Sequence, residues 1–333
     1  MACKNQAETR GEGMKLDVAC LGIVVADVIA VPVEKYPERG RLVLTERMSL
    51  SMGGCAANSA VGMARLGLKV ALIAKVGQDA LGDFCLRVLE AEGVRAEAVR
   101  RDRTASTSST MVMVHPDRER SFIHCVGANG TFREEDIDFG LIRQAKVLNV
   151  GGALLMPGFD GPPLARAIAK GKQMGAITVM DTAWDGTGQW MKLLAEAFPH
   201  VDYLLPSFEE AAMLSGESRA EAIAGRLVEA GAKVVVLKMG EKGCYVASEQ
   251  ENFYLPPFEV EMVDSTGAGD AFVAGFVTGL VKGLDLRGCA EMGNAVGALC
   301  VTRVGTTEGL PTLDEVESLI GRSLQGRNGP GSG

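Results

Sequence analysis

Residues 263–272 read VDSTGAGDAF and run directly into an apolar helical pattern, VAGFVTGLVKG. The small residues allow a tight backbone turn, and a helix that begins at about Gly269 would point several free N–H groups at one place. That arrangement predicts a site for an anion such as phosphate. Asp270 would repel a bound phosphate unless it takes a proton from the group that attacks the phosphorus. The alternative is that Asp270 only caps the helix.

Before this stretch, helical patterns alternate with short apolar strands. The helical patterns cover residues 79–92, 162–174, 209–214 and 219–230, and the strands cover 145–150, 176–180, 203–205 and 234–237. Alternation of this kind is typical of crossover units in a mostly parallel sheet. It predicts one α/β domain over residues 14–322, with a first buried strand at 16–31 that polar Asp27 interrupts.

Two stretches, about 32–52 and 95–125, break this rhythm. They have the alternation and the polar turns of antiparallel hairpins, so we expect them to form a small β-sheet lid beside the main sheet. The ends, residues 1–13 and 323–333, are polar or rich in glycine, and we expect both to be disordered tails.

The composition excludes several classes of partner. The formal net charge is −8, with basic and acidic residues mixed along the chain, so we expect no nucleic-acid partner. No apolar run reaches the roughly 18 residues of a membrane span, and the opening MACKNQAETRGEG lacks the apolar core of a signal peptide. We therefore expect a cytoplasmic protein without membrane contact.

The eight cysteines and three histidines lack zinc-site spacings, so any metal should have oxygen ligands.

A second glycine-rich segment, GGCAANSA at 53–60, opens another helical pattern. Paired glycines allow a ligand to lie against the backbone, and Asn58 offers a donor and an acceptor to hydroxyl groups. Ordinary helix capping would explain the same pattern.

Two further acidic or basic positions are weaker candidates. Glu210 stands in the first helical turn of PSFEEA, where a metal, a phosphate or the helix macrodipole alone would favour it. Lys238 ends an apolar strand, where it would meet either a phosphate or solvent. The sequence contains no P-loop, no G-x-G-x-x-G after the first strand and no G-x-S-x-G elbow, which disfavours a nicotinamide dehydrogenase among others.

In this order and separation, the segments at 53–67 and 264–272 resemble the two signature motifs of the ribokinase-type carbohydrate kinases, the PfkB family. The likeness extends from about residue 16 to residue 319. It implies a ribokinase-like three-layer α/β/α sandwich with a mostly parallel central sheet and a small β-sheet lid. It also implies transfer of the γ-phosphoryl group of ATP to a hydroxyl of a small sugar.

The resemblance implies a role for each candidate residue. Asp270 would be the base that deprotonates the acceptor hydroxyl, and the transferred phosphoryl group would bind the backbone N–H groups of Gly267, Ala268 and Gly269. The sugar-binding positions would be Asp27, Gly53, Gly54 and Asn58. The nucleotide would contact Lys238, Gly240 and Asn294. Glu210 would act on Mg²⁺ through water, although Ser207 stands where the family has asparagine. A loop for a monovalent cation, K⁺, would comprise Asp264, Thr266, Cys300, Arg303, Gly305 and Gly309.

The partners that follow from this resemblance are a small sugar and ATP. A small hairpin sheet with one apolar face gains from being covered, so we also expect a homodimer formed through the lid. Ribokinases proper have a glutamate near the strand end that here reads LNVGG (148–152), so we expect a substrate other than ribose. Two alternatives stay open: a nucleoside kinase of the same family, and a catalytically silent sugar-binding or regulatory protein.

Overall fold

Nine strands form one sheet whose central strands are apolar on both faces, as expected where helices cover both sides. The computed structural model describes residues 16–117 and 119–327. In spatial order the strands are β13 (Asn252–Leu255), β12 (Cys244–Ser248), β11 (Val234–Lys238), β10 (Tyr203–Leu204), β9 (Ile177–Thr182), β8 (Ala145–Ala153), β1 (Leu16–Gly22), β4 (Val70–Gly77) and β5 (Arg95–Asp102).

Neighbouring strands in this sheet run parallel except at one edge, where β12 pairs antiparallel with both β11 and β13. Burial specifies the register: in the pair β1 and β8, Val18 is paired with Val147 and Leu21 with Val150, and all four side chains are buried. The carboxyl ends of the parallel strands therefore lie along one edge of the sheet, where open α/β sheets bind their ligands.

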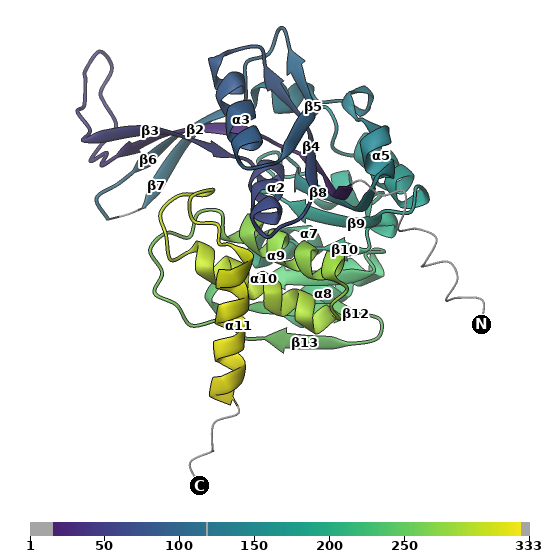
Figure 1. Cartoon of the computed structure of the whole chain (residues 1–333). Coiled ribbons are helices and arrows are strands. Elements are labelled where there is room, and N and C mark those ends of the chain that lie inside the picture. The colour runs from purple at the N-terminus through teal and green to yellow at the C-terminus, as the bar shows by residue number, and fades with distance from the viewer. Residues whose placement is uncertain (1–15, 118, 328–333) are drawn as a thin grey trace.

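Helices cover both faces of the sheet and give three layers (Figure 1). One face carries α4 (Phe139–Arg143), α5 (Pro162–Gln173), α6 (Met191–Leu194), α7 (Phe208–Ser215) and α8 (Ala220–Glu229). The other carries α2 (Cys55–Arg65), α3 (Ala80–Ala91), α9 (Ala268–Lys282), α10 (Leu286–Cys300) and α11 (Leu313–Arg327). Short 3₁₀ helices lie in the connections: η1 (Gly127–Thr131), η2 (Glu134–Asp136), η3 (Phe198–His200) and η4 (Gly240–Lys242).

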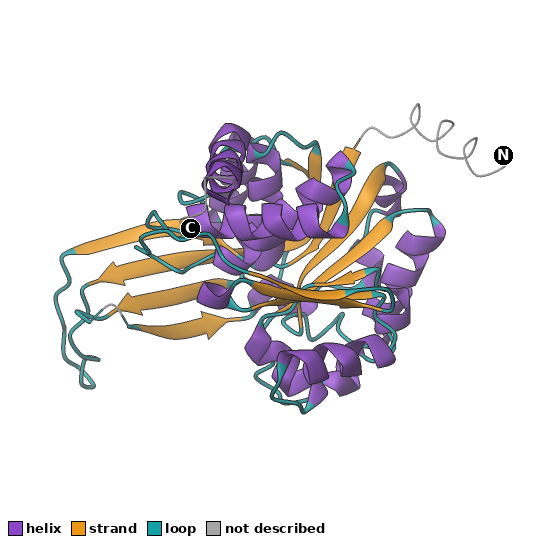
Figure 2. Cartoon of the chain, turned by 90° about the horizontal axis from the view of Figure 1, so that it is seen from below, coloured by secondary structure: helices purple, strands orange, loops and turns teal. Residues whose placement is uncertain are grey.

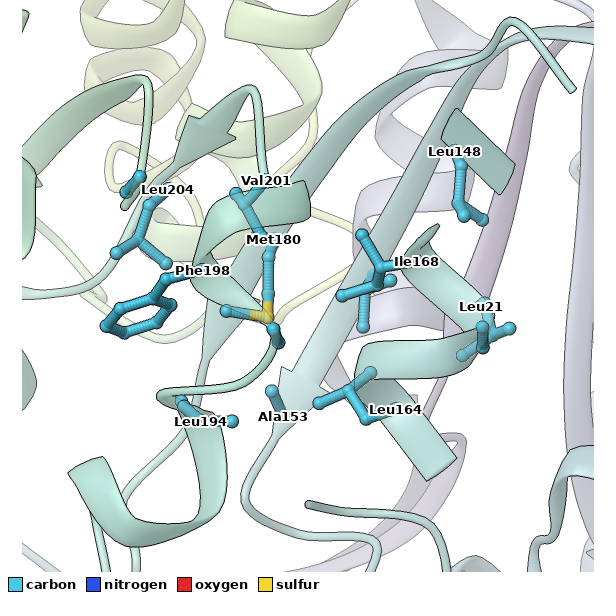
Figure 3. Close-up of a cluster of buried hydrophobic side chains, with 14 of the residues drawn as sticks. Leu21, Leu148, Ala153, Leu164, Ile168, Met180, Leu194, Phe198, Val201 and Leu204 are labelled. Atoms are coloured by element: carbon cyan, nitrogen blue, oxygen red, sulfur yellow. The ribbon is translucent and has the colours of Figure 1, made fainter. Parts of the chain in front are cut away.

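Each face of the sheet has its own cluster of buried apolar side chains. Figure 3 shows part of the first cluster, in which Leu164 and Ile168 of α5 lie with Leu148 of β8 and Met180 of β9. These four side chains are at most 1% exposed, which is typical of a close-packed interior. Over the described ranges, none of the helices combines the length and the apolar character needed to cross a membrane.

A second, four-stranded sheet stands off the large sheet (Figure 2). Its strand order is β3 (Arg47–Gly53), β2 (Val25–Val31), β6 (Ser109–Val114) and β7 (Arg120–Cys125). The predicted fold class, a three-layer sandwich with a mostly parallel central sheet and a small additional β-sheet, is confirmed.

The prediction of one first strand over residues 16–31 is wrong, because the chain leaves the large sheet after Gly22 and continues as β2 in the small sheet. The side-chain amide of Asn129 binds both backbone groups of Val24 at this break. It donates to the Val24 carbonyl over 3.0 Å and accepts from the Val24 N–H over 3.4 Å. The strand can therefore change sheets without leaving these buried backbone groups unpaired.

The predicted lid segments also need correction. Strand β5 lies in the large sheet beside β4, where Ala98 and Val99 are buried, and residues 32–46 contain no strand. The strand β5 therefore forms the edge of the large sheet and not a hairpin of the lid.

The tail predicted from residue 323 is helical as far as Arg327, because α11 continues to that residue. The predicted tail at 1–13 lies outside the described residues.

Candidate active site

The turn that precedes α9 has the geometry of an anion site. Gly267 caps the helix with φ of 81°, and a Cβ there would lie 3.2 Å from the Cα of Thr306, so glycine is required on both counts. Within the described residues, the backbone N–H groups of Gly269 and Asp270 have no hydrogen-bond acceptor. That of Ala268 donates to the Ser265 carbonyl over a long 3.3 Å. The helix start thus directs free donors into the space in front of it.

Asp270 lies in the first turn of α9 and is held by α2. Asn58 Nδ2 donates to Asp270 Oδ2 over 2.7 Å, and the Cys55 thiol also hydrogen-bonds this carboxylate. Burial raises the pKa of Asp270, and the hydrogen bond from Asn58 and the charge of Lys238 oppose the shift. A carboxylate with a raised pKa and one oxygen already positioned is well suited to accept a proton.

The start of α2 depends on the glycine pair. Gly54 has φ of 97°, and a Cβ there would lie 2.6 Å from the carbonyl oxygen of Ile23, so this close approach to the β1–β2 connection needs glycine. A Cβ on Gly53 would lie 2.2 Å from Asp27 Oδ2, which places the Asp27 carboxylate directly against this backbone. The structure therefore brings together the four residues predicted to bind the sugar.

Asp27 lies on β2 and is mostly enclosed. Burial raises the pKa of Asp27, and a hydrogen bond from Thr110 opposes the shift. Nearby, a Cβ on Gly151 would lie 2.7 Å from the backbone nitrogen of Ala56, so no side chain fits at this position, where α2 packs on β8.

Lys238 ends β11 and reaches the start of α9. Its Nζ lies 2.6 Å from Asp181 Oδ1 and 3.4 Å from the position of a Cβ on Gly269. Burial alone would lower the pKa of Lys238. The negative charges of Asp181 and Glu210 have the larger effect, so the pKa of Lys238 is raised. Burial, with the neighbouring charges of Glu210 and Asp270, raises the pKa of Asp181 against the opposing effect of Lys238.

Sequence reasoning missed Asp181. The available signal was an acidic residue near the end of a buried strand, which is the same feature that singled out Asp27. Asp181 is 3% exposed, so its charge needs the ammonium group of Lys238 beside it.

The carboxylate of Glu210 is held by hydrogen bonds from two neighbouring segments of the protein. It forms a capping box with Ser207 at the start of α7, and Thr182 Oγ1 donates to Glu210 Oε2 over 2.8 Å. The position of Glu210 in the first turn of α7 is therefore explained by its role in capping this helix. The same capping box explains why residue 207 is a serine. Among the described residues, no group of three or more histidine, cysteine, aspartate or glutamate side chains is arranged to hold a metal ion.

A cavity of about 680 Å³ lies in front of these groups at the carboxyl edge of the sheet. Its acidic lining residues are Asp181, Glu209, Glu210, Glu241 and Asp270, and its basic ones are Lys238 and Lys242. Gly240 also lines it. Asn294 lies elsewhere and donates through its amide to the carbonyls of Leu255 (3.4 Å) and Pro256 (3.0 Å), so a contact of Asn294 with a nucleotide stays a prediction.

An exposed aromatic side chain completes the wall of the cavity. Trp184 is 56% exposed, and its ring packs edge-on against Trp190 with the centroids 5.0 Å apart. No motif pointed to Trp184, because an aromatic residue in a loop after a strand has no distinctive sequence context.

The loop predicted to hold a monovalent cation is built around Asp264. Its carboxylate accepts from the N–H (2.9 Å) and Oγ1 (2.7 Å) of Thr266, from the Gly305 N–H (3.1 Å) and from the Arg120 guanidinium of β7. Burial alone would raise the pKa of Asp264, but these hydrogen bonds outweigh it and lower that pKa. A strand of the small sheet is thus joined directly to the loop before α9.

Backbone carbonyls converge in the same loop. A Cβ on Gly309 would lie 2.8 Å from the Cys300 carbonyl oxygen and 2.9 Å from that of Gly305. The side chain of Arg303 points away and pairs with Glu315. Any contribution of Arg303 to a cation site would therefore come from its backbone.

Comparison with known proteins gives consistent matches. The model of the pfkB family carbohydrate kinases matches residues 15–313. An uncharacterized sugar kinase of Archaeoglobus fulgidus is 32% identical over 254 residues, which cover 75% of this chain and 98% of that protein. The probable fructokinase-4 of Arabidopsis thaliana is 29% identical (80% and 87% covered). The 2-dehydro-3-deoxygluconokinase of Bacillus subtilis is 28% identical (92% and 96% covered).

Solved structures match over the same extent. The ribokinase of Thermotoga maritima superposes with a TM-score of 0.81 at 26% identity, covering 92% of this chain and 99% of that one. The fructokinase of Xylella fastidiosa, solved with bound ATP, superposes with a TM-score of 0.79 at 25% identity and with the same coverage.

Proposed function

The chain belongs to the pfkB family of carbohydrate kinases, and from this we propose that it transfers the γ-phosphoryl group of ATP to a hydroxyl of a small sugar, with Asp270 as the general base. The observation that carries the proposal is the position of Asp270, in the first turn of α9 and bonded to Asn58 over 2.7 Å. Asn58 and the Cys55 thiol hold this carboxylate in position for the acceptor hydroxyl.

The chemistry follows from this geometry. As the acceptor oxygen attacks the γ-phosphorus and ADP leaves, Asp270 takes the hydroxyl proton. The N–H groups of Gly267 to Gly269 would bind the oxygens of the transferred group and stabilise their negative charge, with the Ala268 N–H exchanging its long bond to the Ser265 carbonyl for one to the phosphoryl group. Because these donors belong to a helix packed against α2 and α10, they need no rearrangement during the reaction.

The charge of the cavity favours a nucleotide that brings its own cation. Five acidic and two basic side chains line it, so a bare triphosphate would be repelled. Mg²⁺ bound to ATP would offset that charge and polarise the phosphates. The phosphates would supply most of its ligands, and Glu210 would reach it through water.

A monovalent cation would fit among the convergent carbonyls of Cys300 and Gly305. K⁺ there would steady the loop that leads into α9, although Arg120 already neutralises Asp264. We expect turnover in K⁺ to exceed turnover in tetramethylammonium several-fold at matched ionic strength. Equal rates with the two cations would remove the cation site.

The outer face of the small sheet suits a second copy of the chain. Leu50, Met111 and Ile123 lie in one row across it and Met48 in the next, and each is at least 40% exposed. We expect light scattering at micromolar concentration to give a dimer and Met111→Glu to give a monomer. Met213→Glu is the matched control, because Met213 is 49% exposed on α7 away from the lid. A monomeric unmodified protein would contradict the dimer.

The competing function is a nucleoside kinase, which the same base and helix start would serve. The test is ADP release from Mg·ATP in the presence of pentoses, hexoses, adenosine and inosine. We expect kcat/KM for the best sugar to exceed that for either nucleoside by at least about 10-fold. A higher kcat/KM for a nucleoside would identify a nucleoside kinase instead of a sugar kinase. Binding of ATP without turnover on any acceptor would favour a catalytically silent binding protein.

A further inference from the structure

Four polar side chains form one row across the small sheet. Ser51 of β3 is paired with Asp27 of β2, Asp27 with Thr110 of β6, and Thr110 with His124 of β7. Paired residues share a face of a sheet, so all four side chains project from the same side. We call this side the inner face of the lid.

The inner face looks toward the active site. Asp27 lies against Gly53 beside the start of α2, which carries Asn58 and through it contacts Asp270. Arg120 lies on the same face, four residues before His124 on β7, and its guanidinium reaches Asp264 in the loop before α9. The inner face therefore contacts the catalytic region at Asp27 and at Arg120.

Hydrogen bonds within the row set what it offers to a ligand. Thr110 hydrogen-bonds the carboxylate of Asp27, and Thr110 Oγ1 lies 3.0 Å from His124 Nδ1. Since an ionised carboxylate only accepts, the Thr110 hydroxyl donates to Asp27 and then accepts from the His124 Nδ1–H. In the neutral ring this leaves His124 Nε2 as an acceptor. His124 is exposed at the edge of the sheet, but its limited desolvation lowers the pKa of the ring, which favours the neutral form at pH 7.

Two buried polar atoms, one in the row and one beside it, have no partner in the described structure. Ser51 Oγ and Asn58 Oδ1 lack any hydrogen bond, although their residues are only 8% and 4% exposed. A buried acceptor without a partner is costly unless a ligand or water satisfies it. Together with Asp27 and His124 Nε2, these atoms form a set that accepts hydrogen bonds from hydroxyl groups.

The cations that the described residues place around this set are already paired with a carboxylate or distant. Arg120 is paired with Asp264, and Lys238 is paired with Asp181. Arg47 lies at the opposite end of the sheet from Asp27 and is exposed to solvent. Among the described residues, the fixed charge facing the set is therefore negative, from Asp27 and Asp270.

We propose that this set of polar groups selects an uncharged polyhydroxy acceptor and rejects acceptors that carry a carboxylate or a phosphate, with Ser51 and His124 as specificity-determining residues. The inference rests on the proposed kinase function and narrows its substrate class. A carboxylate in this position would find a single side-chain donor, the Ser51 hydroxyl, among acceptors and the negative charges of Asp27 and Asp270, and like charges at close range strongly oppose binding.

The test compares neutral sugars with the corresponding acid sugars on the full-length protein. Phosphorylation of fructose, other neutral hexoses and pentoses is measured beside that of 2-dehydro-3-deoxygluconate and fructose 6-phosphate, and the melting temperature is recorded with each compound. We expect kcat/KM for the best neutral sugar to exceed that for any anionic one by at least about 100-fold. An anionic compound used as well as or better than the neutral ones would overturn the inference and leave the kinase function intact.

The binding measurement separates failure of this inference from failure of the function. If no compound is phosphorylated but neutral sugars alone raise the melting temperature, the kinase function fails and the selectivity for neutral ligands stands. If neither class raises the melting temperature or is phosphorylated, both fail.

Substitution at one position supplies the matched control. His124→Arg adds a cation to the inner face and should raise the ratio of kcat/KM for anionic to neutral sugars by about 10-fold or more. His124→Gln keeps a neutral side chain of similar size and should leave that ratio near its original value. An unchanged ratio in a well-folded His124→Arg variant would show that His124 does not face the substrate.

Discussion

An Asp270→Asn variant should fold normally and lose about 10²- to 10⁴-fold in kcat, which is roughly 3 to 5 kcal/mol of barrier. Asparagine keeps the size of the side chain and can still accept from Asn58, whose donor lies 2.7 Å from Asp270 Oδ2. It cannot accept the proton of the attacking hydroxyl. Binding of ATP should be unchanged or tighter, because a negative charge near the γ-phosphate is removed.

A thermal melt is the control for folding of this variant. Asparagine caps helices about as well as aspartate, so a purely structural role predicts nearly full activity. A well-folded Asp270→Asn protein that keeps most of its turnover would therefore reduce Asp270 to a helix cap.

The second large effect is expected at the turn before α9. Gly267→Ala must hold alanine at φ of 81° and bring its Cβ to 3.2 Å from the Cα of Thr306, so the turn should shift. Displacing the N–H groups that stabilise the transferred phosphoryl group should lower kcat by about 10²- to 10³-fold, by analogy with loss of an oxyanion donor.

The other end of α9 offers a matched control for this substitution. Gly283 has φ of 76° and open space around its Cα, so Gly283→Ala imposes similar backbone strain without a clash. Both variants should lose about 1 to 2 kcal/mol of stability from the left-handed conformation. Only Gly267→Ala should lose activity, and equal kcat values for the two variants would contradict an anion site at residues 267–269.

The local sequence was sufficient to predict a site residue where the backbone conformation allows only one residue type. Gly54 and Gly267 both adopt positive φ at helix starts, and such turns leave a visible glycine pattern. The alternation of strands and helices likewise predicted the layered fold, because crossover units need both elements in turn. Asp27 was identified because a charged side chain inside an apolar strand is costly to bury unless it has a functional partner.

Contacts between distant segments could not be predicted in this way. The pair Lys238 and Asp181 spans 57 positions, and Arg120 reaches Asp264 across 144. Neither partner has a local pattern that requires the other. The break between β1 and β2 was missed for the same reason, since the amide of Asn129 that satisfies it lies 105 positions away.

The central claim is tested most directly by following the γ-phosphorus. The protein is incubated with Mg²⁺, K⁺, ATP labelled at the γ-phosphate and the best acceptor from the panel, and the labelled products are separated. We predict that the label appears in a sugar phosphate, with one ADP formed for each molecule of product. Label found only in inorganic phosphate, or transferred equally well by Asp270→Asn, would contradict the account.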